Sequence, residues 1–130
     1  MEQKRAFLYC RMAHPDPTAL ELQKEQLMAY AGEQGFSVAG IAAECGSGLD
    51  YSRAGLTEAL AALGDGEADV LLVSSPCRIG RDIVKNNALL HWLKERGIKI
   101  VCADGAELRT VSELFDVLLK EYRTLPQQVH

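Results

Sequence analysis

The fold is decided by the stretch Val70-Leu71-Leu72-Val73, followed by Ser74-Ser75-Pro76-Cys77-Arg78-Ile79-Gly80-Arg81-Asp82. Four apolar residues in succession are typical of a strand buried on both faces, as the strands of parallel sheets are. The polar segment after the run carries two arginines three positions apart, and a helical pattern begins at Asp82. The stretch therefore predicts a buried strand, a loop with two cations and the start of a helix.

Strand and helix patterns alternate along the rest of the chain. Short apolar runs predict strands, and stretches bounded by capping residues and glycines predict helices. Thr18 with Glu21, and Thr110 with Glu113, match the capping-box pattern at the start of a helix. The expected strands cover residues 6–10, 36–43, 70–73 and 98–103, and the expected helices cover 18–35, 54–63, 82–96 and a last helix that begins at Thr110 and ends soon after Tyr122.

This alternation predicts βαβ units, and hence an α/β fold with a mostly parallel central sheet of four to five strands and helices on both faces. The 130 residues are enough for one compact domain, and we find no repeat or linker that would divide them. We therefore expect a single domain over residues 1–130. Ligands of such sheets bind outside the carboxyl ends of the strands.

Composition excludes some classes of protein. The formal net charge is −4, which argues against a protein that coats nucleic acid, although a local basic patch can still bind it. We find neither an apolar stretch long enough to span a bilayer nor the apolar core of a signal peptide, so we expect a cytoplasmic protein with no membrane partner.

Four cysteines are present, and their spacing does not match a zinc site. Cys10, Cys77 and Cys102 lie in or beside apolar strand runs. We expect these thiols to be buried and reduced rather than paired in disulfides. No residue pattern indicates a metal or another cofactor.

Arginines follow the expected strands at the edge where a ligand would bind. Arg11 follows the first strand, Arg53 lies in the region after the second, and Arg78 and Arg81 follow the third. A guanidinium offers a planar fork of donors that matches phosphate oxygens. Any one of these arginines could instead pair with one of the 18 acidic residues. Three arginine-bearing segments at one sheet edge favour an anion site.

The motifs around these arginines resemble those of the catalytic domain of the serine recombinases, the resolvase and DNA-invertase family. The resemblance covers roughly residues 5 to 105. The family's opening motif of tyrosine, small residue, arginine, aliphatic and serine corresponds to Tyr9-Cys10-Arg11-Met12-Ala13, and the glutamine on its first helix corresponds to Gln23. Its arginine-glycine-leucine segment corresponds to Arg53-Ala54-Gly55-Leu56. Its signature of aspartate, arginine, aliphatic, glycine, arginine and aspartate corresponds to Cys77-Arg78-Ile79-Gly80-Arg81-Asp82.

In that family the serine attacks a DNA phosphodiester and becomes joined to the 5′ end, while arginines hold the phosphate without metal or ATP. The resemblance implies that Arg11, Arg53, Arg78 and Arg81 bind phosphate and that Gln23 supports the site. Ala13 stands where the nucleophilic serine belongs and has no attacking oxygen. Cys77 stands where the family has an aspartate, so a candidate acid, base or orienting carboxylate is missing as well.

Other groups are poor replacements for the serine. Cys77 and Cys10 lack the arginine six positions later that marks a cysteine phosphatase, because Ile83 and Asp16 occupy those places. The remaining candidates have simpler interpretations. His14 is a solvated loop histidine, Ser47 and Ser52 offer hydroxyls that stabilise turns or caps, and Thr18 is a helix cap.

We therefore interpret the chain as a recombinase-family domain that retains phosphate-binding arginines and is inactive in DNA cleavage. Its expected partners are the DNA phosphate backbone, contacted weakly and without sequence preference, and further copies of itself or an intact recombinase. A role as an oligomerisation or regulatory partner of an intact recombinase is one alternative. A second alternative is an active enzyme with a displaced nucleophile. A third is a phosphate- or nucleotide-binding module, although the chain has no phosphate-cradling glycine motif to support it.

The last helix bears on the oligomer. Its apolar residues would either contact another subunit or pack on this domain's own sheet, and the sequence leaves both open. Family members continue into a longer helix and a DNA-binding domain. We expect no C-terminal DNA-binding domain in this chain. The apolar residues in question are Val111, Leu114, Leu118 and Leu119.

Overall fold

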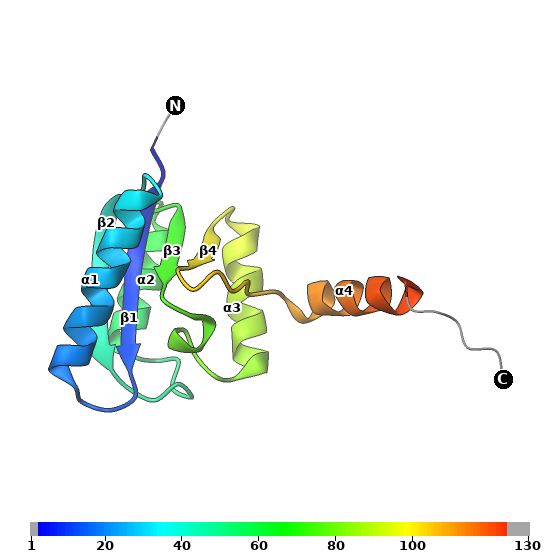
Figure 1. The fold of residues 1–130 in the computed structure, drawn as a ribbon, viewed down its shortest axis with the longest axis horizontal. Helices are drawn as coiled ribbons and strands as arrows, with labels where there is room; N and C mark the ends of the chain where they lie inside the picture. The colour runs from blue at the N-terminus through cyan, green and yellow to red at the C-terminus, as the bar shows by residue number, and fades with distance from the viewer. Residues whose placement is uncertain (1–2, 125–130) are drawn as a thin grey trace.

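Four parallel strands form the central sheet in the order β2-β1-β3-β4 (Figure 1). The computed structural model describes residues 3–124. All three strand pairs are parallel, with Leu8 opposite Ile41 and Leu72 opposite Val101. The expectation of a mostly parallel sheet is confirmed, with four strands: β1 (Arg5–Met12), β2 (Ser37–Cys45), β3 (Val70–Val73) and β4 (Lys99–Cys102).

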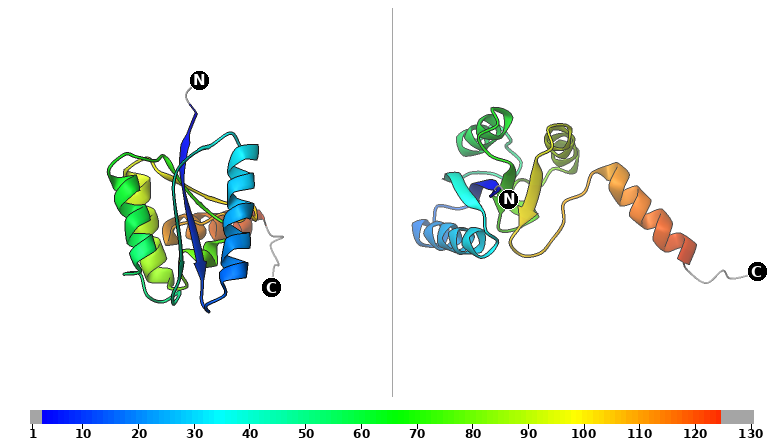
Figure 2. Two further views of the ribbon diagram at one scale, coloured as in Figure 1. Left: turned by 90° about the vertical axis from the view of Figure 1, so that its left-hand side faces the viewer. Right: turned by 90° about the horizontal axis from the view of Figure 1, so that it is seen from above.

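Helices cover both faces of the sheet (Figure 2). α1 (Pro17–Glu33) lies on one face, and α2 (Ala54–Gly64) and α3 (Ile83–Glu95) lie on the other. A short 3₁₀ helix, η1 (Pro76–Arg78), joins β3 to α3. This arrangement confirms the α/β prediction. Within residues 3–124, no helix has both the length and the apolar character that crossing a bilayer requires.

Alternating side chains of the strands supply the core. Phe7 and Tyr9 of β1 face α2 and α3, whereas Leu8 and Cys10 face α1, and all four are buried. In β3 every residue is buried, because helices cover both of its faces. β3 spans the residues that the continuous apolar run predicts.

Helix α1 begins at a different residue from the one predicted. Asp16, not Thr18, is the N-cap, and its carboxylate accepts the N–H of Ala19 at 3.0 Å. Pro17 occupies the first helical position, where its missing N–H costs nothing and its fixed φ suits the helix. Thr18 thus lies inside the first turn and does not cap it. The other predicted cap is confirmed: Thr110 Oγ1 accepts the N–H of Glu113 at 3.2 Å.

Glycines end the helices as the sequence predicts. Gly35 follows α1 with φ of +76°, and Gly97 follows α3 with φ of +71°. Side-chain-bearing residues rarely adopt this left-handed conformation, so glycine stops each helix and lets the chain turn into the next strand.

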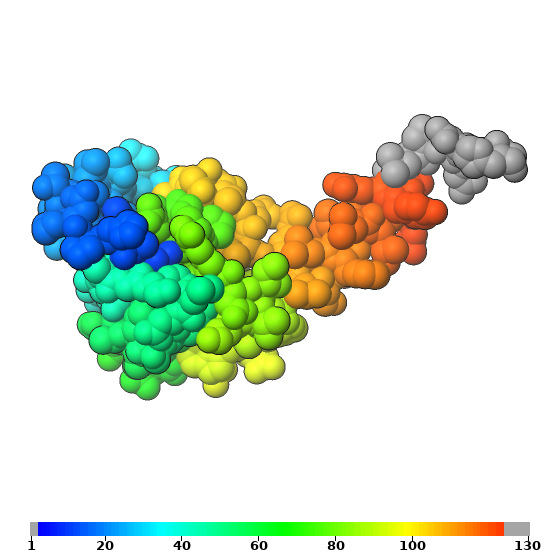
Figure 3. All heavy atoms as spheres, turned by 90° about the horizontal axis from the view of Figure 1, so that it is seen from below, coloured from blue at the N-terminus to red at the C-terminus, as the bar shows by residue number. Residues whose placement is uncertain are grey.

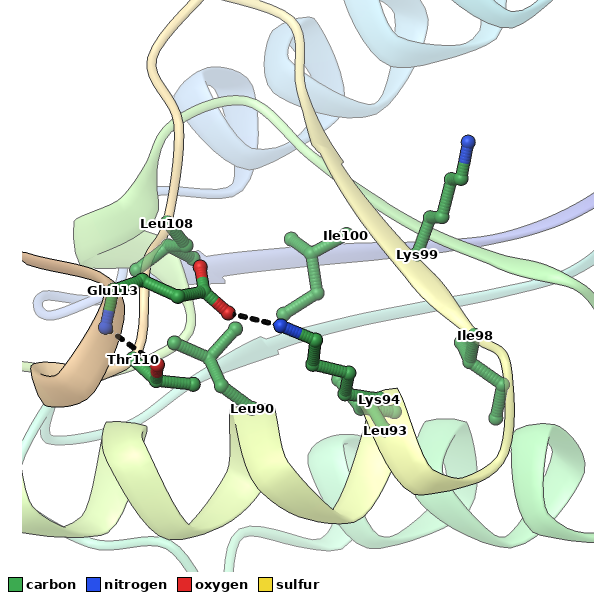
Figure 4. A pocket seen from close by; sticks show the side chains of 9 residues that line it. All are labelled: Leu90, Leu93, Lys94, Ile98, Lys99, Ile100, Leu108, Thr110 and Glu113. Atoms are coloured by element: carbon green, nitrogen blue, oxygen red, sulfur yellow. Dashed lines mark hydrogen bonds and ion pairs between the residues drawn. The ribbon is translucent and has the colours of Figure 1, made fainter. Parts of the chain in front are cut away.

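Helix α4 (Val111–Thr124) projects away from the sheet (Figure 1). Its first turn is fixed to α3 by two contacts. The N–H of Val111 donates to Asn87 Oδ1 at 2.7 Å. Lys94 pairs with the Glu113 carboxylate, as Figure 4 shows. Beyond this junction the apolar side chains are exposed, with Leu118 at 60%. The alternative in which this helix packs on its own sheet is therefore wrong.

Replacing a side chain in the doubly covered strand should cost more than replacing an exposed one of the same type. We expect Leu71→Ala, at a fully buried position, to lower the free energy of unfolding by about 2–5 kcal/mol, because it leaves a cavity. The matched control is Leu22→Ala on α1, where the side chain is 53% exposed and the change should be about 0.5 kcal/mol or less. Urea unfolding followed by circular dichroism measures both, and equal losses would contradict the core assignment.

Candidate phosphate-binding site

Three loops meet at the carboxyl edge of the sheet, and Figure 3 looks onto this edge. Residues after β1 (blue) lie against the loop after β2 (teal), which lies against the segment after β3 (green). Two backbone hydrogen bonds join these segments: Gly46 N–H donates to Met12 O at 3.0 Å, and Arg81 N–H donates to Gly48 O at 2.8 Å. Each loop carries predicted site residues, so the fold brings those residues to one place.

Arg11 is buried at the centre of this edge, with 1% of its surface exposed. Its guanidinium donates to three backbone carbonyls on two loops: Nη1 to Gly46 O at 2.9 Å, Nη2 to Cys77 O at 2.6 Å and Nε to Arg78 O at 3.0 Å. Burial lowers the pKa of Arg11, and the nearby charge of Arg53 lowers it further. Arg11 therefore holds loops together in this conformation, and its donors are occupied by protein.

Arg53, the residue before α2, is also buried, with 5% exposed. Its Nη2 donates to Ile79 O, while Nε and Nη1 have no hydrogen-bond partner. Its guanidinium lies between two aromatic rings, 5.6 Å from the centroid of Tyr9 and 5.7 Å from that of Tyr51. Cation–π attraction partly offsets the loss of water around the charge.

Arg78 and Arg81 lie nearer the solvent. Arg78 is half-buried; its Nη1 donates to Arg11 O at 3.0 Å, and its buried Nε has no partner. The Arg81 side chain is exposed. These two guanidiniums are thus the ones that a ligand could contact without displacing a loop.

Within the described part of the chain, none of the four guanidiniums forms an ion pair with a carboxylate. The ion pairs within residues 3–124 involve other cations, and the donors of Arg11, Arg53 and Arg78 are bonded to backbone carbonyls. The alternative in which these arginines pair with acidic residues is therefore not what the structure shows. A concentration of positive charge that forms no ion pair with the described carboxylates attracts an anion, even in a chain whose net charge is −4.

Gln23 joins α1 to the end of β1. Its Oε1 accepts the N–H of Arg11 at 3.2 Å, and its Nε2 donates to the carbonyl of the same residue at 3.3 Å. Gln23 thus contacts the backbone of Arg11 and not its guanidinium. It lines an open cavity at the carboxyl edge together with Met12, Ser74, Ser75 and Arg78.

Ala13 directly follows Met12, which lines this cavity, and is exposed. Its methyl group offers neither a donor nor an acceptor. The alternative hydroxyls are used elsewhere: Ser47 Oγ accepts the N–H of Leu49 at 3.1 Å, and Ser52 Oγ donates to Asp50 Oδ1 at 2.6 Å. Their roles as turn residues agree with the sequence interpretation.

Glu44 is a residue of this edge that the sequence analysis missed. Its carboxylate accepts the N–H groups of Gly55 at 2.8 Å and Leu56 at 3.0 Å, and the hydroxyl of Tyr9 at 2.7 Å. It therefore occupies the N-terminus of α2, where free N–H groups favour a negative charge. This bond network fixes the start of α2, and with it Arg53.

Tyr51 was missed as well. Its hydroxyl bonds to Asn86 Oδ1 and accepts the N–H of Asp82 at 3.2 Å, so it connects the loop after β2 to the start of α3. The partners lie 31 and 35 positions away, and no local pattern indicates such contacts.

The cysteines differ partly from expectation. All four are free; Cys10 and Cys102 are buried as predicted, but Cys77 is exposed, and so is Cys45. Cys77 follows the strand in the short 3₁₀ helix and so lies beyond the buried layer. Its Sγ is 3.1 Å from Ser75 Oγ. Within residues 3–124 no group of three or more His, Cys, Asp or Glu side chains could hold a metal ion.

Comparison with known proteins gives consistent matches. The family model described as "Resolvase, N terminal domain" matches residues 6–122. The structure is similar to the C-terminal catalytic domain of ISC1926 TnpA, an IS607-like serine recombinase, with a TM-score of 0.71 and 25% identity over 90% of this chain and 79% of that one. Two structures that are each 18% identical share the fold. The N-terminal catalytic domain of TP901-1 integrase has a TM-score of 0.73, over 92% of this chain and 94% of that one. A resolvase family site-specific recombinase from Streptococcus pneumoniae has a TM-score of 0.71, over 93% of this chain and 87% of that one.

The thiols should react in two classes. Burial raises the pKa of Cys10 and of Cys102 to about 11 each, so at pH 8 few of these groups are thiolates, and reagent cannot reach them. We expect iodoacetamide to label Cys45 and Cys77 rapidly in the folded protein. Cys10 and Cys102 should react only after unfolding, as peptide mass spectrometry can show. Rapid labelling of Cys10 in the folded state would contradict the burial of β1.

Proposed function

The chain belongs to the resolvase family of serine recombinases, and from this premise we propose that its domain binds the DNA phosphate backbone through Arg11, Arg53, Arg78 and Arg81 without cleaving DNA. The observation that carries the proposal is the gathering of four arginines at the sheet edge where such folds bind ligands, none of them in an ion pair with a carboxylate of residues 3–124. DNA phosphates are the anions that the family resemblance implies for this edge.

We assign the arginines different tasks. Arg78 and Arg81 are accessible and make the first contacts with phosphate, whereas the buried Arg11 holds the loops after β2 and β3 in place through its hydrogen bonds to their carbonyls. Arg53 has two donors without acceptors, and a phosphate oxygen would supply one. Gln23 supports the site by fixing the backbone of Arg11.

Loss of cleavage follows from the chemistry at residue 13. Transfer of a phosphodiester to the protein requires an oxygen or sulfur nucleophile that can attack the phosphorus. Ala13 has neither, and Ser47 and Ser52 hydrogen-bond within their own loop. The arginines can still stabilise charge on a bound phosphate, but no bond to the protein forms. The proposed molecule is thus a pseudoenzyme that keeps the electrostatic half of its family's mechanism.

A second proposal concerns assembly. α4 leaves the domain with an apolar stripe that no other described element covers, and we propose that a second copy, or an intact recombinase, packs on this stripe. Asn87, through its bond to Val111, and the Lys94–Glu113 ion pair (Figure 4) anchor the start of the helix to α3 and so give it a defined direction. The exposed residues are Val111, Leu114, Phe115, Leu118, Leu119 and Tyr122.

We propose a cytoplasmic location, because DNA binding and four free thiols both suit a reducing compartment that contains DNA. A nucleotide-binding module remains the alternative function. It would use the same arginines, and the salt dependence of binding separates the two, since a duplex engages several phosphates at once.

Fluorescence anisotropy with a generic DNA duplex tests phosphate binding. We expect weak binding whose logarithmic affinity falls with log salt at a slope of roughly two to four, because each neutralised phosphate contributes about 0.9. Arg78→Ala with Arg81→Ala should reduce the slope by about two. The control, Arg96→Ala with Lys99→Ala, removes equal charge at the opposite edge of the sheet and should leave the slope nearly unchanged. Absence of binding at low salt would contradict the proposal.

Sedimentation velocity tests the assembly. We expect the chain to self-associate, and Leu118→Asp to raise the dissociation constant by about tenfold or more, because a charge replaces an apolar contact. Leu22→Asp on α1 changes a comparably exposed leucine outside the stripe and should have little effect. A monomer at all concentrations, alone and with an intact recombinase, would refute a role for the stripe in assembly.

A further inference from the structure

Arg53 is covered in a way that limits its proposed role. Only 5% of its surface is exposed, so a phosphate cannot reach the guanidinium in this conformation. Yet two of its donors, Nε and Nη1, lack acceptors, although buried polar groups are almost always hydrogen-bonded. An arginine held in this state has donors available for a ligand and no path by which the ligand can enter.

The two rings that cover Arg53 differ in their burial and in the elements that carry them. Tyr9 belongs to β1 at the centre of the sheet and is fully buried. Tyr51 belongs to the loop after β2 and is half-buried. Access to Arg53 can therefore open on the side of Tyr51 without disturbing the sheet, but not on the side of Tyr9.

Tyr51 is held closed by polar contacts with the start of α3. Its hydroxyl donates to Asn86 Oδ1 and accepts the N–H of Asp82, and Asn86 Nδ2 in turn donates to Gly80 O at 3.1 Å. The hydroxyl lies so close to Gly80 that a Cβ at that position would collide with it. Lys85 Nζ is 5.5 Å from the ring centroid. The contacts form a latch whose direct members are Tyr51, Asn86, Gly80 and Asp82.

The latch uses none of the four arginine side chains. Other contacts that hold the loop after β2 do use arginine side chains: Arg11 donates to Gly46 O, and Arg53 donates to Ile79 O in the segment after β3. A ligand that engages those guanidiniums would weaken these bonds. The Tyr51 latch would remain, together with the backbone bond from Arg81 N–H to Gly48 O; of the two, the latch holds the Tyr51 ring over Arg53.

We propose that Tyr51 is a gate over Arg53, locked by Asn86, and that phosphate contacts Arg53 only when this gate opens. Tyr51 is thus a positioning residue that acts through Arg53, and the proposal rests on the phosphate-binding function given above. Opening exposes the unpartnered Nε and Nη1 groups to the incoming anion. The closed state leaves Arg78 and Arg81 as the first phosphate contacts.

Modification of arginines with phenylglyoxal, mapped by peptide mass spectrometry, tests the gate without any DNA. We expect Arg53 to react slowly in the unchanged protein and about fivefold faster in Tyr51→Phe and in Asn86→Ala, because each loses a latch hydrogen bond. Arg81 is exposed throughout and serves as the internal reference. Tyr30→Phe, on the other face of the sheet, is the matched control and should leave Arg53 protected.

DNA anisotropy on the same variants separates the gate from the binding function. We expect Tyr51→Phe to raise duplex affinity, and this gain to vanish in an Arg53→Ala background, which a merely structural effect would not produce. Unchanged protection of Arg53 in both latch variants would overturn the gate. Faster modification without a gain in affinity would uphold the gate and overturn the phosphate role of Arg53. If Tyr51→Phe does not fold, Asn86→Ala, which keeps the ring, decides the test.

Discussion

The buried guanidinium of Arg11 is the interaction on which the carboxyl edge of this domain depends. It donates to carbonyls of Gly46, Cys77 and Arg78, which lie 35 to 67 positions away in the sequence. A buried charge is tolerated only when it is well hydrogen-bonded, and here the planar fork matches three carbonyls on two loops. Lysine has a different geometry and could not reproduce this set of contacts. Without Arg11, the loops after β2 and β3 would lose their common support.

This dependence separates the arginines from residue 13 in what each contributes to the fold. Ala13 is exposed at the end of β1, so a serine or an alanine there makes little difference to the fold. Arg11 and Arg53 are bound into the structure, and their loss would destabilise it. The presence of these two arginines is therefore weaker support for phosphate binding than the accessibility of the half-buried Arg78 and the exposed Arg81. The phosphate proposal depends chiefly on the outer pair and on the lack of an ion pair to these guanidiniums within residues 3–124.

Sequence patterns were sufficient for the order of the strands and main helices and for the sheet edge at which the arginine segments meet. The apolar run 70–73 is β3, and the arginine segments meet at the expected edge. Burial of Arg11 and Arg53 could not be predicted, because it depends on carbonyls and rings from distant loops. The cap of α1 was mispredicted because Asp16 and Thr18 are both good capping residues and Pro17 decides between them. Glu44 and Tyr51 have no local motif, since their described hydrogen-bond partners lie 11 to 35 positions away in the sequence.

The central claim, phosphate contact without cleavage, is tested most directly by trapping a covalent protein–DNA adduct on a denaturing gel. The unchanged chain and Ala13→Ser should be incubated with the same duplex under the low-salt conditions that give binding, with an intact serine recombinase and its own site as the positive control. The account predicts no adduct for the unchanged chain, and an adduct for Ala13→Ser if the arginines still align a phosphate. An adduct formed by the unchanged chain would contradict the account, and mapping the linked residue would identify the nucleophile that replaces serine.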